Sequence, residues 1–229
     1  MYPQRRRTVR HAFGLGLLVA LLLLALSACG GGGGGGEEEA KVHHIPEDEK
    51  ALPPGQYHTQ EFRPSASFRL DKGWYSEAET SDSFAFSGDM GQIGFSRIPE
   101  VFKPGTVDVV EAPKDMVSWF QQHPYLQADK PEPVTVGGVK GKQFNLVVAK
   151  DRLEQDRAAG VCGVDCVDIY RLSSGETISF FKEEKVRIIV LEDVKGETVT
   201  IDFESLIADF EEFAPKAEKV LDSVEWTDS

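Results

Sequence analysis

The clearest chemical signal in the sequence is a pair of cysteines, Cys162 and Cys166, separated by Gly163-Val164-Asp165. Three intervening residues, one of them glycine, allow a tight turn that brings the α-carbons within the roughly 4.4–6.8 Å that a disulfide requires. A redox-active pair is the alternative, but thioredoxin-like sites have two residues between their cysteines. A zinc site needs two further ligands, which the neighbourhood lacks. We therefore predict a structural disulfide and no metal site.

Histidines and acids give no catalytic pattern. In the region expected to fold, His58 and His123 are the only imidazoles, and neither belongs to a G-x-S-x-G or H-E-x-x-H motif. We expect His123 to be a surface residue at a helix end. His43-His44 and the acids at 47–49 lie in a polar stretch with no fixed geometry for a metal. The sequence therefore predicts a protein that is not an enzyme and has no cofactor.

The first 28 residues have the layout of a secretory signal. Arg5, Arg6, Arg7 and Arg10 form a positive segment, and an apolar run from Ala12 to Leu26 follows. This run of about 15 residues is shorter than the roughly 20 that a permanent membrane-spanning helix needs. We expect export, which places the cysteine pair in a compartment that favours disulfides.

The tetrad Leu26-Ser27-Ala28-Cys29 resembles the lipobox of bacterial lipoproteins. The resemblance implies that the Cys29 sulfur receives diacylglycerol, that cleavage falls before Cys29, and that two or three acyl chains such as palmitate anchor the protein stably. It implies a cell-membrane location on the extracytoplasmic side. In a host with an outer membrane, Gly30 lacks the acidic character that retains such lipoproteins at the inner membrane. The alternative is a plain cleaved signal followed by a chance cysteine.

Charge restricts the partners of the exported chain. Removing 28 residues with four arginines and no acid leaves 201 residues with a net charge of 21 − 38, or −17. A chain this acidic lacks the excess of basic residues that neutralises the phosphates of nucleic acid, so nucleic acid is not an expected partner. Anionic lipid would repel it weakly, which favours a domain held off the membrane.

Composition divides the chain into three parts: a signal peptide at 1–28, a tether at 29–52 and one extracytoplasmic domain at 53–229. The tether begins with glycines 30–36 and continues with acidic and polar residues that cannot form a core. As a flexible coil, residues 30–52 would span roughly 25 Å on average. We read this part as a spacer.

Strand patterns dominate the predicted domain. Extended runs are expected at 57–62 and 67–70, and glycine-containing turns predict four hairpins: 84–86 with 93–95, 134–136 with 144–148, 167–172 with 177–181, and 187–191 with 198–203. In the last strand Val199, Ile201 and Phe203 alternate with polar residues. This alternation predicts an antiparallel sheet with one buried face and one wet face.

Two helices are expected. The first covers 113–122, with Pro113 at its first position and His123-Pro124 at its end. The second covers 204–221, where Pro215 should break or kink it near Phe213-Ala214. Successive hairpins with few helices predict an α+β fold, mostly antiparallel sheet flanked by helices.

Both ends of the domain resemble PsbP-like domains. Residues 68–74 look like the apolar strand and Gly-Trp that open that family, and residues 220–226 look like its closing helix and short strand. The resemblance implies a sandwich-like fold that acts by binding proteins, and it assigns no functional residue.

Two functions follow as expectations. The first is a lipid-anchored extracytoplasmic domain that binds a protein or envelope component without catalysis. The alternative is a small-molecule or lipid carrier, which requires a large apolar pocket between the sheet and its helices. A solute receptor with two lobes and a hydrolase have less support.

Overall fold

Residues 42–46, 49–151, 162 and 165–227 are described by the computed structural model of the chain. The predicted signal peptide, Cys29 and the glycine run lie outside these residues. The described part is mostly antiparallel β-sheet with helices α1 (Met116–Gln122) and α3 (Phe210–Leu221). Its strands form three sheets, named here A, B and C.

Sheet B is the centre of the fold. Its path is β10 (Leu126–Ala128), β12 (Val139–Val148), β15 (Glu184–Val194), β16 (Glu197–Leu206), β7 (Gly91–Ser96), β6 (Ser83–Gly88), β5 (Trp74–Ser76) and β2 (Ala51–Leu52), with β11 (Glu132–Val136) also paired to β12.

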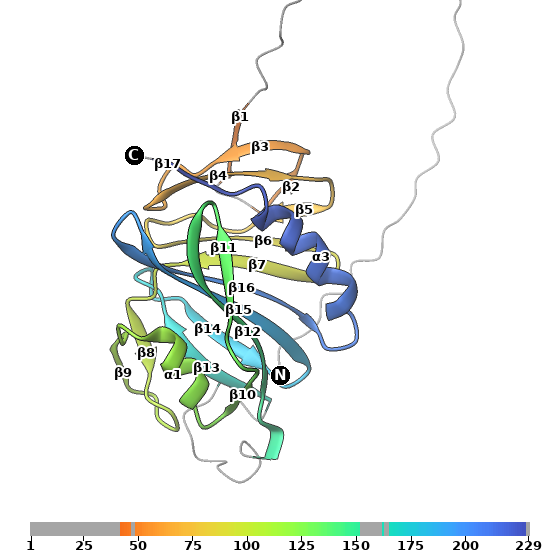
Figure 1. Cartoon of the computed structure of the whole chain (residues 1–229). Helices are drawn as coiled ribbons and strands as arrows, with labels where there is room; N and C mark the ends of the chain where they lie inside the picture. Colours follow the sequence, from red (N-terminus) through yellow and green to blue (C-terminus); the bar gives the residue numbers. More distant parts are fainter. Residues whose placement is uncertain (1–41, 47–48, 152–161, 163–164, 228–229) are drawn as a thin grey trace, which may run out of the picture. The chain divides into compact units, whose positions relative to one another are not determined.

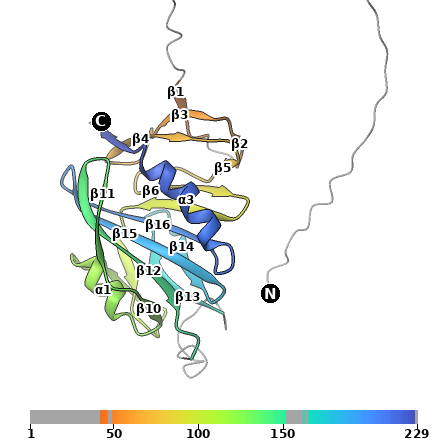
Figure 2. The same cartoon turned by 45° about the vertical axis from the view of Figure 1, so that its right-hand side comes forward.

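Two smaller sheets flank it. Sheet A has the order β1 (Val42–His44), β3 (Gly55–His58), β4 (Ser65–Leu70) and β17 (Glu225–Thr227). Sheet C has the order β14 (Thr177–Phe181), β13 (Cys166–Arg171), β8 (Glu100–Phe102) and β9 (Val109–Glu111). Sheet A and α1 lie at opposite ends of the described domain (Figure 1), and the rotated view shows the same arrangement (Figure 2). Three of the predicted hairpins are present with the predicted partners. The fourth turns at Gly137-Gly138 as expected, but residues 134–136 pair with 139–141 and not with 144–148, because β12 begins directly after the turn.

Side chains from the two faces of sheet B enter two separate apolar clusters. On β15, Ile189 and Leu191 enter a cluster with sheet A and α3, which is rich in phenylalanine. Val186, Ile188 and Val190, which alternate with them, enter a second cluster with sheet C and α1. Burial on both faces explains why β15 reads as a continuous apolar run, since alternation appears only when one face meets water.

The prediction that one face of sheet B is wet is wrong at its centre. Thr200, Asp202 and Glu204 point away from Val199, Ile201 and Phe203, yet they are also buried. Sheet C packs over the middle of this row, where Tyr170 of β13 reaches Asp202 directly. Because this cover comes from a segment about 30 residues earlier, local alternation did not indicate it.

Both helices begin later than predicted. Asp115 caps α1 by accepting the backbone N–H of Ser118 at 2.8 Å, so Pro113 stays outside the helix. Residues Glu204–Leu206 continue β16 instead of opening α3. The predicted break before Pro215 is absent, because Phe213, Ala217 and other apolar residues of α3 remain packed on the core although proline removes one backbone donor.

The folded region also starts earlier than the predicted boundary at residue 53. Strand β1 pairs in parallel with β3, and β2 pairs with β5. Ile45 and Leu52 are buried in the cluster beneath sheet A. Strand β3, in turn, ends at His58, and the carboxylate of Glu79 accepts the backbone N–H groups of residues 60–62 at 2.7–3.0 Å.

Gly141 lies where two strands approach too closely for a side chain. A Cβ atom at this position would lie 2.2 Å from the carbonyl oxygen of Val190. We expect Gly141→Ala to lower the free energy of unfolding by about 1–3 kcal/mol, because β12 and β15 must separate. Urea denaturation tests this, with Gly88→Ala as control, since a Cβ there meets nothing closer than 3.5 Å. Equal stability of the two variants would contradict the prediction.

Candidate functional site

Cys162 and Cys166 form a disulfide in the structure, with their α-carbons 5.6 Å apart. Cys166 is buried at the start of β13, whereas Cys162 is exposed. The bond ties Cys162 to the first residue of β13 in sheet C. Cys29 lies outside the described residues, so its lipidation stays a prediction.

The two histidines are on different parts of the fold. His58 ends β3 in sheet A, whereas His123 follows α1. His123 is 4% exposed and not a surface residue as predicted, because its ring packs between Trp119 and Tyr125. Burial lowers its pKa to about 4, so it is neutral at pH 7. Its Nε2 has no hydrogen-bond partner among the described residues, and we assign it to the core.

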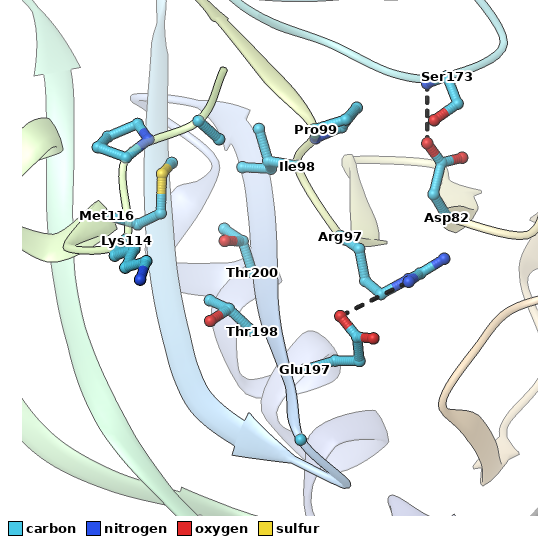
Figure 3. Close-up of a pocket in the computed structure, with 13 residues that line it drawn as sticks. Asp82, Arg97, Ile98, Pro99, Lys114, Met116, Ser173, Glu197, Thr198 and Thr200 are labelled. Carbon is cyan, nitrogen blue, oxygen red and sulfur yellow. Dashed lines mark hydrogen bonds and ion pairs between the residues drawn. The ribbon is translucent and has the colours of Figure 1, made fainter.

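A polar cleft lies between sheets B and C (Figure 3). It has a volume of about 400 Å³. Three segments build it: residues 97–99 between β7 and β8, residues 112–116 leading into α1, and residues 196–200 at the start of β16. Asp82 and Ser173 complete the lining. The cleft therefore depends on long-range packing and not on one sequence motif.

Arg97 is the central charged group of this cleft. One terminal nitrogen donates to the carbonyl oxygen of Ser81 at 3.1 Å, and the other lies 3.6 Å from a carboxylate oxygen of Glu197 (Figure 3). Its Nε is buried and has no hydrogen-bond partner among the described residues. A buried donor without a partner is costly.

Asp82 lies beside Arg97, whose backbone N–H donates to the carbonyl oxygen of Asp82 at 2.7 Å. Its carboxylate accepts the backbone N–H of Ser173 and the hydroxyl of Thr80, both at 2.8 Å. Burial acts to raise the pKa of Asp82, but these hydrogen bonds outweigh it and lower that pKa below its usual value. Asp82 is therefore committed to holding the turn between β13 and β14 against β6.

The remaining walls combine hydroxyls and apolar side chains. Thr198 and Thr200 of β16 face Ile98 and Met116 across the cleft, and Lys114 is exposed at its rim (Figure 3). Its lining, as the structure describes it, contains no histidine or cysteine. This combination offers hydrogen bonds, charge and apolar contact, and it provides no adjacent nucleophile and base.

A buried acidic row continues from Thr200 along β16. Tyr170 donates to Asp202 at 2.9 Å, and Gln92 donates to Glu204 at 2.8 Å. Burial raises the pKa of Asp202 to about 6, and burial together with the charges of Glu184 and Asp202 raises that of Glu204 well above its usual value. Gly94 gives the Asp202 carboxylate room, since a Cβ there would lie 3.2 Å from it. The alternation of polar and apolar residues in the sequence did not indicate that these acidic side chains are buried.

No group of three or more His, Cys, Asp or Glu side chains in the described ranges is arranged to hold a metal ion. None of the helices in those ranges is long and apolar enough to cross a membrane.

Comparisons with known proteins add little. No family model matches the sequence, and no curated protein matches it significantly. Among solved structures, the chain is similar to LpqN, described as involved in cell envelope biogenesis of Mycobacterium tuberculosis. The identity is 10%, the alignment covers 78% of this chain and 90% of that chain, and the TM-score is 0.27. A likeness of this degree supports no argument about function.

Proposed function

We propose that this protein is a lipid-anchored extracytoplasmic binding protein whose domain holds an extended segment of an envelope protein without catalysing a reaction. The signal and lipobox pattern at residues 1–29 supports the location. The observation that carries the binding role is the free edge of sheet C at β9, which leads directly into the cleft around Arg97.

Among the residues that the structure describes, no strand pairs with the outer side of β9. Ala112 donates to the carbonyl oxygen of Pro99, and the N–H of Lys103 bonds to the carbonyl oxygen of Asp108. Antiparallel strands alternate between bonded and non-bonded pairs, so the N–H and C=O groups of Val109 and Glu111 point outward from the sheet. Outward groups of this kind are what an added partner strand pairs with.

Exposed apolar side chains accompany this edge. Val107 is 76% exposed and Val110 is 37% exposed. The chain then passes through Ala112 and Lys114, which line the cleft. An extended polypeptide paired with β9 would continue into the cleft, whose wall includes the guanidinium group of Arg97 and the hydroxyl of Thr198.

We infer a PsbP-like domain because the segments that resemble the two ends of that family are neighbours. Strand β17 pairs with β4, with Trp226 opposite Ala66. Proteins of that family generally act by binding other proteins, which is consistent with the proposed role.

The carrier alternative has less support. It requires a large apolar space between the sheet and its helices, and in the described part of the chain both faces of sheet B are filled by packed side chains. The clefts that the structure describes are open surface features.

Site-specific photocrosslinking in the native host tests the binding role. A photoreactive amino acid at Val110 or Lys114 should give a discrete protein adduct, whereas the same residue at Lys140, on a distant hairpin, should not. Val109→Pro should abolish the adduct, because proline removes an outward N–H without breaking the ladder between β8 and β9. Equal labelling from all three positions, or an adduct indifferent to Val109→Pro, would refute the proposal.

A further inference from the structure

A second cleft, remote from the one around Arg97, lies between sheet A and α3. Its volume is about 410 Å³. The β4 strand contributes Arg69, the turn into β5 contributes Asp71 and Lys72, and α3 contributes Lys216 and Lys219. In both views α3 lies beside β5 (Figures 1 and 2). The described structure thus brings together basic residues from segments almost 150 positions apart.

The charge of this cleft is opposite to that of the whole chain. Its lining has four cationic residues and one acidic residue, or 4 − 1 = +3, in a protein of net charge −13. Lys219 Nζ lies 2.6 Å from Asp71 Oδ2, so the single acidic residue of the lining is already paired with one of the four cations. Arg69, Lys72 and Lys216 make no side-chain ion pair or hydrogen bond with any residue that the structure describes. Three cations are therefore available to an anion.

The floor of the cleft is apolar and fixed. Trp74 is 6% exposed and packs against Phe213, with ring centroids 6.0 Å apart. Val220 is buried beside it, and Pro215 forms part of the wall. Tryptophan and lysine side chains that line one cleft are the combination found at the boundary between lipid headgroups and acyl chains, since the ring is amphipathic and lysine stems extend along apolar surface.

The position of the cleft relative to the tether favours a membrane source for the anion. The described domain begins at Val42 on β1, where Val42 pairs with Gln56 and Gln56 pairs with Arg69. Two strand spacings, about 10 Å, therefore separate the point of entry from the β4 segment that carries Arg69. If the chain is anchored at Cys29, sheet A contains the first strand of the domain that follows the anchor in the sequence.

We propose that this cleft binds the headgroup of an anionic phospholipid, with the phosphate among Arg69, Lys72 and Lys216 and the glycerol and first methylenes against Trp74. The inference rests on the proposed membrane anchor for its biological setting, and it amends the expectation that anionic lipid repels the chain. At physiological ionic strength charges are screened beyond roughly 8–10 Å, so the local cationic group outweighs distant acids.

Vesicle binding by the mature chain carrying Cys29→Ser tests the cleft without any acyl anchor. We expect co-sedimentation with vesicles that contain phosphatidylglycerol and none with pure phosphatidylcholine vesicles. Each cation near an anionic surface is worth about 1 kcal/mol, or roughly fivefold in affinity, so Lys72→Gln with Lys216→Gln should weaken binding by roughly 25-fold. The matched control is Lys140→Gln with Lys142→Gln, which changes the net charge equally on the hairpin of β11 and β12.

The outcomes separate the alternatives. Equal weakening by both double variants would overturn the cleft, because net charge alone would then explain binding. Binding to phosphatidylcholine, or to neither vesicle, would also overturn it. Full competition by inorganic phosphate would assign the cleft to a soluble anion and overturn the lipid source. Failure of these assays leaves the anchor at Cys29 standing, since that anchor is measured separately by the mass of the native protein.

Discussion

Replacing Asp202 with asparagine should remove much of the loss of folding stability that we expect as pH rises from about 4 to above 6. Burial raises the pKa of Asp202 from 3.8 to about 6. A folded-state pKa above the unfolded value means that the folded state binds the proton more tightly. The resulting stabilisation is present below pH 4 and is lost as pH rises through 6. A shift of this size corresponds to at most about 3 kcal/mol.

Urea denaturation over a series of pH values measures this effect. The asparagine side chain keeps the size of Asp202 and still accepts from Tyr170, so the variant should be more stable than the natural protein at pH 8 by about 1–3 kcal/mol. Some pH dependence should remain, because the pKa values of Glu204 and Glu184 are also raised by burial. The control is Asp89→Asn on the exposed turn between β6 and β7. An unchanged pH profile in the Asp202 variant would show that this carboxyl titrates normally.

Cys29→Ala should transfer the protein from the membrane fraction to the soluble fraction, or leave it unprocessed with its signal attached. The prediction follows from the resemblance of residues 26–29 to a lipobox. Each buried acyl methylene contributes roughly 0.8 kcal/mol, so two or three chains hold a protein stably at the bilayer. Without them, an acidic domain has no comparable attachment. Fractionation of cells that express each form gives the result.

The double variant Cys162→Ala with Cys166→Ala is the matched control, since it removes the two other cysteines, which form the disulfide, and keeps Cys29. It should stay in the membrane fraction. Intact-mass spectrometry of the native protein supplies the direct measurement, because an acylated N-terminal cysteine has a defined added mass. A mature chain that begins elsewhere and retains a bare thiol at Cys29 would contradict the anchor.

The hairpins were predictable because their signals are local. Gly137 and Gly138 have φ values of +56° and +79°, which glycine adopts readily, and they join β11 to β12 as the sequence indicated. The polar residues of β16 were misread for the opposite reason. Gln92, the partner of Glu204, is 112 residues away. Local alternation cannot show that a second sheet covers Thr200 and Asp202.

The cleft around Arg97 was equally inaccessible to sequence reasoning. Arg97 and Glu197 are 100 positions apart and meet only because β7 and β16 are neighbours. A residue such as Arg97 gives no periodic or motif signal of its own. The cationic cleft beside α3 has the same origin, since the overall acidity of the chain conceals three cations that packing brings together.

Strand β1 has a mechanical consequence for a tethered protein. It is held by three residue pairs at the rim of sheet A, and it is the first described element that tension transmitted from the N-terminal side would reach. Under load this short strand should peel away before β3 and β4, because far more contacts hold those strands. Each residue released from β1 lengthens the N-terminal tether by up to about 3.3–3.6 Å. We therefore expect a brief tension to detach β1 and lengthen the connection to the membrane while the rest of the domain stays folded.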